Sequence, residues 1–326
     1  MDGARSQEDT ALDFPKSIRI HEEGPREGIQ IESRQFSVTE KAALIEALAD
    51  TGLKQIDCVS FVNPKRVPNM ADADQVARAI RKKPGVRYTG LWLNQKGLER
   101  ALALPLDVVG SIRVTASETF SIRNTGRDIA QTFDEQRLWM ETYRKHDVGL
   151  EWGYVMTAFG CNYEGEVPVA RVLEMIARIV DLAAEFEQPL TGVYLADTVG
   201  FATPLDIERR IGAVRERWPE LKIGLHLHDT RGTGMPNVYA ALRMGVDQFD
   251  SSVAGLGGCP FAEHKGAAGN VCTEDIVFMC EEMGIATGVD LEALIDCARR
   301  AETMFGHVLP GKVMHAGSLA RFREAA

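Results

Sequence analysis

Strand-like and helix-like segments alternate along this chain, and eight such pairs fit within roughly 250 residues. The expected strands are Ser17–His21, Gln55–Ser60, Arg87–Leu93, Val108–Val114, Leu150–Met156, Gly192–Leu195, Lys222–His228 and Gln248–Val253. The expected helices are Thr39–Asp50, Ala71–Lys82, Lys96–Ala103, Ile129–Lys145, Val167–Glu187, Pro204–Arg217, Met235–Met244, Thr273–Met283 and Leu291–Phe305. Eight βα units are the number in a (β/α)8 TIM barrel, so we predict this α/β fold with additional C-terminal helices from about residue 273.

A doubly wound parallel sheet is the alternative fold, because it shows the same alternation of strands and helices. No Gly-x-Gly-x-x-Gly segment follows the first expected strand, and the chain contains no Walker loop. The missing nucleotide motifs weaken this alternative, and we expect neither a nicotinamide nor a flavin cofactor.

The composition indicates a globular protein, with 45% hydrophobic and 26% charged residues. The polar, acidic segment 1–16 is expected to be a flexible tail, and residues 17–326 to form a single catalytic domain. A net charge of −10 argues against a nucleic-acid partner, and the absence of a long apolar stretch argues against a membrane span. The six cysteines form no Cys-x-x-Cys pair, which is typical of a reduced, cytoplasmic protein without a zinc-thiolate site.

The segment His226-Leu227-His228 ends the seventh expected strand. Side chains two residues apart on a strand point to the same side, so both imidazoles can meet one divalent metal. Histidine and carboxylate ligands with open coordination positions suit a Lewis-acid metal that polarises an oxygen atom. The alternative is that the two histidines make ordinary hydrogen bonds.

Further polar residues follow the carboxyl ends of the other expected strands, where the reactive groups of a TIM barrel lie. They comprise segment 24–30 after the first strand, Asp57 in the second, Asp197 after the sixth, and the glycine-rich segment 255–260 with Gly269-Asn270 after the eighth. Because these ends share one rim of a barrel, we expect the side chains to form one site.

Several motifs identify a family resemblance. The segment Gly24-Pro25-Arg26-Glu27-Gly28-Ile29-Gln30 resembles the GPRDGLQ signature of 3-hydroxy-3-methylglutaryl-CoA lyases, which belong to the DRE-TIM metallolyases. Further matches are Asp197-Thr198-x-Gly200, His226-x-His228-Asp229-Thr230, the whole block 250–260, and Gly269-Asn270. The similarity extends from about residue 18 to about residue 315.

The resemblance implies a magnesium or manganese ion held by Glu27, His226 and His228, with Asn270 approaching the same ion. It implies a carbon–carbon lyase that cleaves a 3-hydroxy-3-methylglutaryl-CoA-like thioester to acetyl-CoA and a keto acid.

Other residues receive roles from the same resemblance. Arg26 would stabilise the enolate, Cys259 would assist proton transfer, and Asp57 and Asp197 would support the site or carry protons. The candidates for substrate binding are Gln30, Asn124, Arg231 and Lys265, and a homodimer or higher oligomer is implied.

The chain departs from the family pattern at the site itself. The usual aspartate of GPRDG is Glu27, and the usual glutamate at the end of strand two is Asp57. The longer Glu27 and the shorter Asp57 compensate for each other if both carboxylates face the same metal ion. In that case the double variant Glu27→Asp with Asp57→Glu would rescue the activity lost in either single variant. Arg231 replaces an aromatic residue, and two extra residues, His264 and Lys265, add charge that would recognise a different acyl group.

Two alternatives stay open. A condensing synthase of the same superfamily would join acetyl-CoA to a 2-oxo acid, but the chain leaves no room for the usual regulatory domain, and the Gly257-Gly258-Cys259-Pro260 loop favours the lyase. A non-catalytic paralogue is favoured by Glu27 alone. His21, His146, His307 and His315 are interpreted as ordinary surface or packing histidines.

Overall fold

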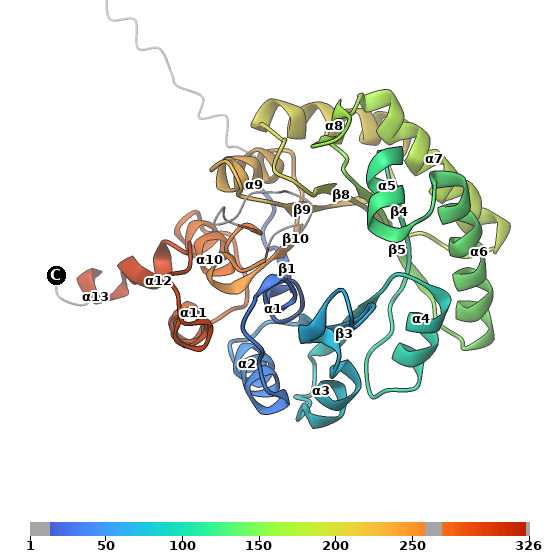
Figure 1. Ribbon diagram of the computed structural model, residues 1–326. Coiled ribbons are helices and arrows are strands. Elements are labelled where there is room, and N and C mark those ends of the chain that lie inside the picture. The colour runs from blue at the N-terminus through green and yellow to red at the C-terminus, as the bar shows by residue number, and fades with distance from the viewer. Residues whose placement is uncertain (1–13, 258–268, 324–326) are drawn as a thin grey trace, which may run out of the picture.

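Eight parallel strands curve around a central axis in the computed structural model, which describes residues 14–257 and 269–323 (Figure 1). The hydrogen-bonded order is β3-β2-β1-β10-β9-β8-β5-β4, so that β3 and β4 are the two ends of the sheet. The strands are β1 (Arg19–Glu22), β2 (Gln55–Phe61), β3 (Arg87–Trp92), β4 (Gly110–Thr115), β5 (Leu150–Met156), β8 (Gly192–Asp197), β9 (Lys222–Leu227) and β10 (Gln248–Ser251). The predicted (β/α)8 barrel is confirmed.

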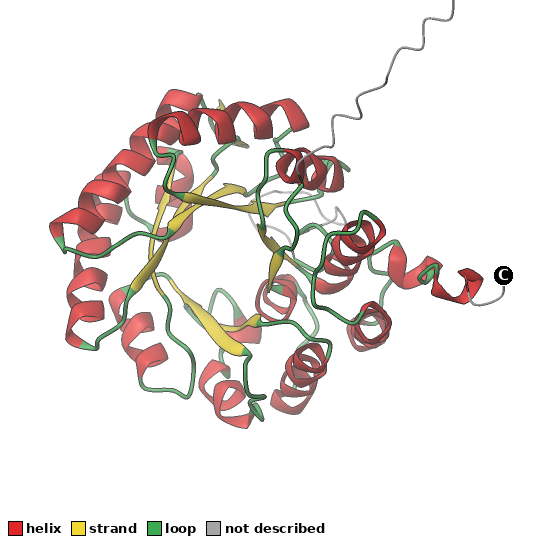
Figure 2. Cartoon of the chain, turned by 180° about the vertical axis from the view of Figure 1, so that it is seen from behind, coloured by secondary structure: helices red, strands yellow, loops and turns green. Residues whose placement is uncertain are grey.

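Helices cover the outside of the strands, as the view from behind also shows (Figure 2). Those between consecutive barrel strands are α2 (Val38–Asp50), α3 (Ala73–Ala79), α4 (Gln95–Leu102), α6 (Ile129–Lys145), α7 (Val169–Glu185), α8 (Pro204–Arg217) and α9 (Gly234–Arg243). The C-terminal helices are α10 (Thr273–Glu282), α11 (Leu291–Phe305), α12 (Val313–Ala316) and α13 (Ala320–Arg323). None of the described helices is long and apolar enough to cross a membrane.

The spacing of the apolar residues explains why strands and helices form where they do. In β9, Ile223, Leu225 and Leu227 are at most 4% exposed and belong to the hydrophobic core. The residues between them are Gly224 and His226, which therefore face the barrel interior. In α7 the buried residues recur at three- and four-residue spacing, which gives the helix one apolar face: Val172, Met175, Ile176, Ile179 and Leu182.

An aromatic stack fills the centre of the barrel. The rings of Tyr154 and Tyr194 lie 4.7 Å apart and nearly parallel, and the Trp152 ring meets Tyr194 edge-on at 4.9 Å. A Cβ on Gly224 would come within 2.5 Å of the Tyr194 ring, so this strand position requires glycine. Tyr154 lines the cavity at the carboxyl ends of the strands, and together with Trp152 and Tyr194 it also lines a separate cavity at their amino ends.

Several local expectations are corrected by the structure. Helix α5 (Glu118–Thr125) was not among the expected helices, and a short hairpin of β6 (Gly160–Cys161) and β7 (Gly165–Glu166) was not expected. Segment Gly24–Gly28 forms a π-helical turn, η1, continued by α1 (Ile29–Ile31), neither of which was expected. A π-helical turn is a wider helical turn that is frequent at functional sites.

Candidate active site

The η1 turn presents Arg26 and Glu27 to the barrel interior. Pro25 occupies its first turn, where the missing backbone N–H costs nothing, and the Gly24 N–H donates to Glu22 Oε1 at 2.8 Å. All five residues of the turn are buried. Two adjacent side chains of opposite charge are thereby held at the rim where the barrel strands end.

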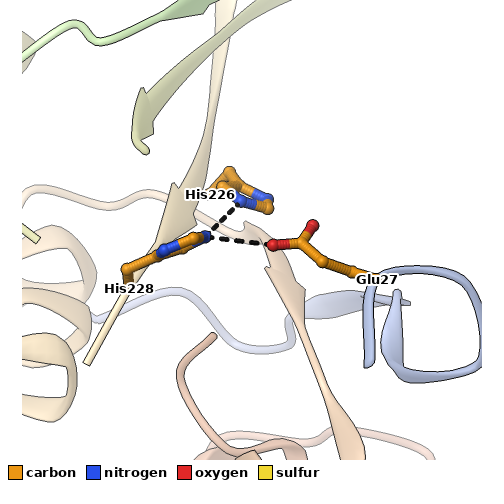
Figure 3. Close-up of side chains that lie close together, drawn as sticks. All are labelled: Glu27, His226 and His228. Atoms are coloured by element: carbon orange, nitrogen blue, oxygen red, sulfur yellow. Dashed lines mark hydrogen bonds and ion pairs between the residues drawn. The ribbon is translucent and has the colours of Figure 1, made fainter. Parts of the chain in front are cut away.

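The two histidines at the carboxyl end of β9, His226 and His228, point toward Glu27 (Figure 3). His226 Nε2 lies 3.0 Å from His228 Nε2, and Glu27 Oε1 lies 3.3 Å from the same His228 nitrogen. Two ligands about 2.1 Å from a metal and at right angles to each other are about 3.0 Å apart. These two separations match neighbouring ligands of one ion, all three ligand atoms lie within 4.8 Å of one another, and the donor set suits a divalent ion.

Asn270 lies beside this cluster. Its backbone pairs with His228 in an isolated bridge, and its side-chain N–H2 donates to Ser252 Oγ at 2.9 Å. The Asn270 Oδ1 atom is buried and has no partner among the described residues. A Cβ on Gly257 (φ 99°) would lie 2.7 Å from the Asn270 amide and 3.0 Å from Glu27, so only glycine fits beside the cluster.

Arg26 is the cationic centre of the site. Its Nε donates to Asp57 Oδ2 at 2.9 Å, its Nη1 donates to Glu27 Oε2 at 3.0 Å, and its Nη2 contacts Glu23. Although burial disfavours the charged carboxylate, the guanidinium holds the pKa of Glu27 well below its usual range. Glu27 is therefore ionised at neutral pH, as a carboxylate that binds a metal must be.

A closed chain of polar contacts, called the circuit below, connects Arg26 to the Nδ1 side of His226. His226 Nδ1 lies 3.2 Å from Asp250 Oδ2, and the other oxygen of Asp250 lies 3.3 Å from His21 Nδ1. The circuit closes through Thr89 Oγ1, which lies 3.4 Å from His21 Nε2 and 3.3 Å from Asp57 Oδ1. His21 is thus part of this buried network, and its interpretation as an ordinary histidine is corrected.

Asp250 fixes the orientation of His226, and neutralising it should weaken metal binding. Burial opposes protonation of His226, but the hydrogen bond with Asp250 raises the pKa of His226 above its ordinary value. Asp250→Asn is expected to lower Mn²⁺ affinity by about 10- to 100-fold, because the carboxylate sets the ring tautomer that directs Nε2 toward the ion. Isothermal titration with Mn²⁺ measures this loss, and an unchanged affinity would remove Asp250 from the account.

The hypothesis that Glu27 and Asp57 share a metal-centred space is revised, because Asp57 meets Arg26 and Thr89 instead. Arg26 couples the two carboxylates. We expect the double exchange Glu27→Asp with Asp57→Glu to recover part of the catalytic loss of each single exchange. The affinity for Mn²⁺ should change in Glu27→Asp and in the double variant, but not in Asp57→Glu. Equal effects of both single exchanges on Mn²⁺ affinity would contradict this division.

The remaining predicted residues divide into cavity-lining residues, a buried residue outside the cavity lining, and residues that the structure does not describe. Gln30 and Asn124 line the cavity that contains the histidine pair, and Gln30 also accepts a hydrogen bond from Ser60. Asp197 is fully buried and accepts from the backbone N–H groups of Phe201 and Ala202, which gives it the position of a loop support. Cys259 and Lys265 lie outside the described residues.

Arg231 does not line this cavity. Its Nη1 donates to the carbonyl oxygens of Val199 and Gly200 at 3.0 and 2.8 Å, and its guanidinium lies over the Phe201 ring at 5.5 Å. These contacts orient Arg231 toward the loop after β8, so we assign it no substrate contact.

Behind the site, the buried acid Glu274 predicts a pH effect on stability. Its side chain is 0% exposed, Oε1 has no partner among the described residues, and burial raises its pKa from 4.5 to about 7. The stability due to the protonated form is complete below about pH 4.5 and is lost as pH rises through about 7. Wild type should therefore lose up to about 3 kcal/mol relative to Glu274→Gln between about pH 5 and pH 8. Urea unfolding of both proteins tests this, and parallel pH profiles would contradict it.

A family model described as HMGL-like matches residues 17–300. The chain belongs to the HMGL-like family. Among its relatives, hydroxymethylglutaryl-CoA lyase of Bacillus subtilis is 38% identical over 301 residues, which cover 92% of this chain and 97% of that protein. A 3-hydroxy-3-isohexenylglutaryl-CoA/hydroxymethylglutaryl-CoA lyase of Pseudomonas aeruginosa is 39% identical over 295 residues, which cover 90% of this chain and 95% of that protein. The resemblance predicted from the sequence is confirmed.

A solved structure of an HMG-CoA lyase from Acinetobacter baumannii, in complex with coenzyme A and 3-methylmalate, has the same architecture. The TM-score is 0.85 at 36% identity, and the match covers 94% of this chain and 96% of that one. HMG-CoA lyase of Bacillus subtilis gives a TM-score of 0.86, also at 36% identity, covering 93% and 98% of the two chains.

Proposed function

We propose that this protein is a divalent-metal-dependent carbon–carbon lyase that cleaves 3-hydroxy-3-methylglutaryl-CoA, or a related 3-hydroxyacyl-CoA, to acetyl-CoA and a keto acid. One observation carries the proposal. His226, His228 and Glu27 converge next to Arg26 in a cavity at the carboxyl ends of the barrel strands. Relatives named as lyases of this kind, matched over most of the chain, support the same reaction.

Magnesium or manganese fits the residues present. Glu27, His226 and His228 would hold the ion, and the free Oδ1 of Asn270 would add an oxygen donor. When bound, such an ion supplies Lewis-acid polarisation of substrate oxygens and lowers the pKa of a hydroxyl group. Although Glu27 is one methylene longer than the usual aspartate, its carboxylate lies within 3.3 Å of His228 Nε2. This contact argues against a non-catalytic paralogue that has lost its metal site.

The chain's own residues would then carry out the cleavage. A basic group of the site accepts the proton of the tertiary hydroxyl, and the O–H electron pair forms the C3 carbonyl of the keto acid. The bond between C2 and C3 breaks, and its electron pair passes to the thioester enolate. Arg26 is placed to bind the enolate oxygen, since its guanidinium is fixed by Glu23, Glu27 and Asp57 before the reaction begins. Protonation of the enolate carbon gives acetyl-CoA, and Cys259 remains the predicted proton carrier.

The cavity offers room for the acyl group beside this centre. Gln30 lies in α1, directly after the turn that holds Arg26, whereas Asn124 comes from α5, which follows β4. Apolar side chains complete the lining: Val62, Leu91, Leu93, Trp139 and Met156. We propose Gln30 and Asn124 as substrate contacts. A homo-oligomeric state and a cytoplasmic location remain predictions from the sequence.

The test is to incubate the purified protein with 3-hydroxy-3-methylglutaryl-CoA and Mg²⁺ or Mn²⁺, and to follow acetyl-CoA and acetoacetate by mass spectrometry. Cys259→Ala should abolish rapid cleavage, whereas Cys297→Ala, a buried thiol in α11, serves as the matched control. No cleavage by folded, metal-loaded protein would reject this substrate. Formation of a condensed product from acetyl-CoA and a 2-oxo acid would instead favour the synthase.

A further inference from the structure

Among the described residues, three arginines line the active-site cavity, and they differ in their partners. Arg26 meets three carboxylates, and Arg127 lies 3.4 Å from Glu135 while it donates to a backbone carbonyl. Arg113 donates only through Nε, to the Ser111 hydroxyl at 3.0 Å. Among residues 14–257 and 269–323, no carboxylate oxygen lies within 4.0 Å of the Arg113 guanidinium. Arg113 is thus the cavity arginine without an anionic partner in that part of the chain.

The protein holds this guanidinium firmly. It lies over the Tyr154 ring at 4.5 Å, and Tyr154 is itself stacked on Tyr194. The backbone N–H of Arg113 donates at 2.8 Å to Gln136 Oε1, whose side chain belongs to a residue only 2% exposed. The ring and the hydroxyl fix the guanidinium, and its two terminal nitrogens are left for a ligand.

The acids nearest to Arg113 are already engaged. Arg113 also borders a small inner cavity shared with His21 and Asp57. Asp57 uses one oxygen for Arg26 and the other for Thr89, and Asp250 bridges the two histidines of the circuit. A partly buried cation without a partner is unfavourable, and the planar guanidinium fork matches a carboxylate in two-point contact.

We propose that Arg113 binds a carboxylate of the acyl group, so that the substrate class is an acyl thioester with an anion at the β4 wall. This inference rests on the proposed function. Strand β4 stands three places from β9 in the sheet, so the acyl group would extend from the histidine pair across to Arg113. The carboxylate is either the free end of the glutaryl chain or a second acid on the branch at C3.

Ligand binding separates these two sources without any need for turnover. The probes are the dicarboxylate 3-hydroxy-3-methylglutarate and its tricarboxylate analogue 3-carboxymethyl-3-hydroxyglutarate, in which a carboxymethyl group replaces the methyl branch, titrated into Mn²⁺-loaded protein. Arg113→Gln should weaken binding by about 10- to 100-fold, and Arg113→Lys should recover part of it. A loss for both probes assigns the glutaryl carboxylate, and a loss confined to the analogue assigns the branch acid.

The matched control is Arg87→Gln, at the start of β3 and at the opposite end of the barrel, where Arg87 pairs with Glu151. Unchanged affinity of both probes in Arg113→Gln would overturn the inference, as would a wild-type protein that binds neither probe. The proposed function is tested separately, by measuring acetyl-CoA release from 3-hydroxy-3-methylglutaryl-CoA. Arginine-dependent binding without cleavage would reject the lyase and leave the carboxylate contact standing.

Discussion

Replacing Arg26 by glutamine should lower kcat for thioester cleavage by roughly 10²- to 10³-fold or more. The substitution removes the cation placed next to Glu27 and the histidine pair, where the enolate charge would develop. It also leaves three buried carboxylates without their shared partner, which costs on the order of 3–5 kcal/mol of stability. Steady-state kinetics, with urea unfolding in parallel, measures both effects.

Arg26→Lys is the matched variant, because it keeps the charge but cannot reach three carboxylates with a planar fork. We expect its kcat to lie between that of wild type and that of Arg26→Gln, with the lost stability only partly restored. A folded Arg26→Gln protein that cleaves within tenfold of wild type would show that the enolate is stabilised elsewhere.

Replacing His228 by alanine should cause the largest loss of metal affinity, well beyond the roughly 10- to 100-fold typical of an outer-shell partner. His228 Nε2 is the atom that both other ligands approach, at 3.0 Å from His226 and 3.3 Å from Glu27. Calorimetric titration with Mn²⁺ measures the effect. His307→Gln is the control, since His307 is exposed and pairs with Glu32 away from the cavity. Equal affinities for the two variants would place the metal at another site.

The sequence predicted the strands well because their apolar residues are buried by the helices around them. The predicted spans of β5, α6, α8 and α11 agree with the structure to the residue. Helix α2 begins earlier than expected: Ser37 is its N-cap and forms a capping box with Glu40, instead of Thr39 starting the helix. Local boundaries of this kind depend on one or two side-chain hydrogen bonds.

After α6, Asp147 takes the left-handed conformation with φ 55°, where glycine is the usual residue. Helix α5 was missed because it spans only eight residues, of which Phe120 and Ser121 alone are buried. Neither feature has a strong apolar period, so the sequence gives little signal for it.

The candidate site was partly predictable. A strand period of two residues placed His226 and His228 together, and the family motif supplied Arg26 and Glu27. The partner of Asp57 was not predictable, because β2 has a register shift between Asp57 and Val59 that changes which way its side chains face. The role of His21 was missed, since its contacts with Asp250 and Thr89 join strands far apart in the chain.

We expect cleavage to require a divalent ion held by Glu27, His226 and His228. The most direct test measures acetyl-CoA release from 3-hydroxy-3-methylglutaryl-CoA as a function of free Mn²⁺, in wild type and in His228→Ala. We predict no release after chelation, and recovery in wild type with half-maximal activity near the calorimetric Kd. His228→Ala should require far more metal. Cleavage that survives chelation, or the same metal dependence in both proteins, would contradict the account.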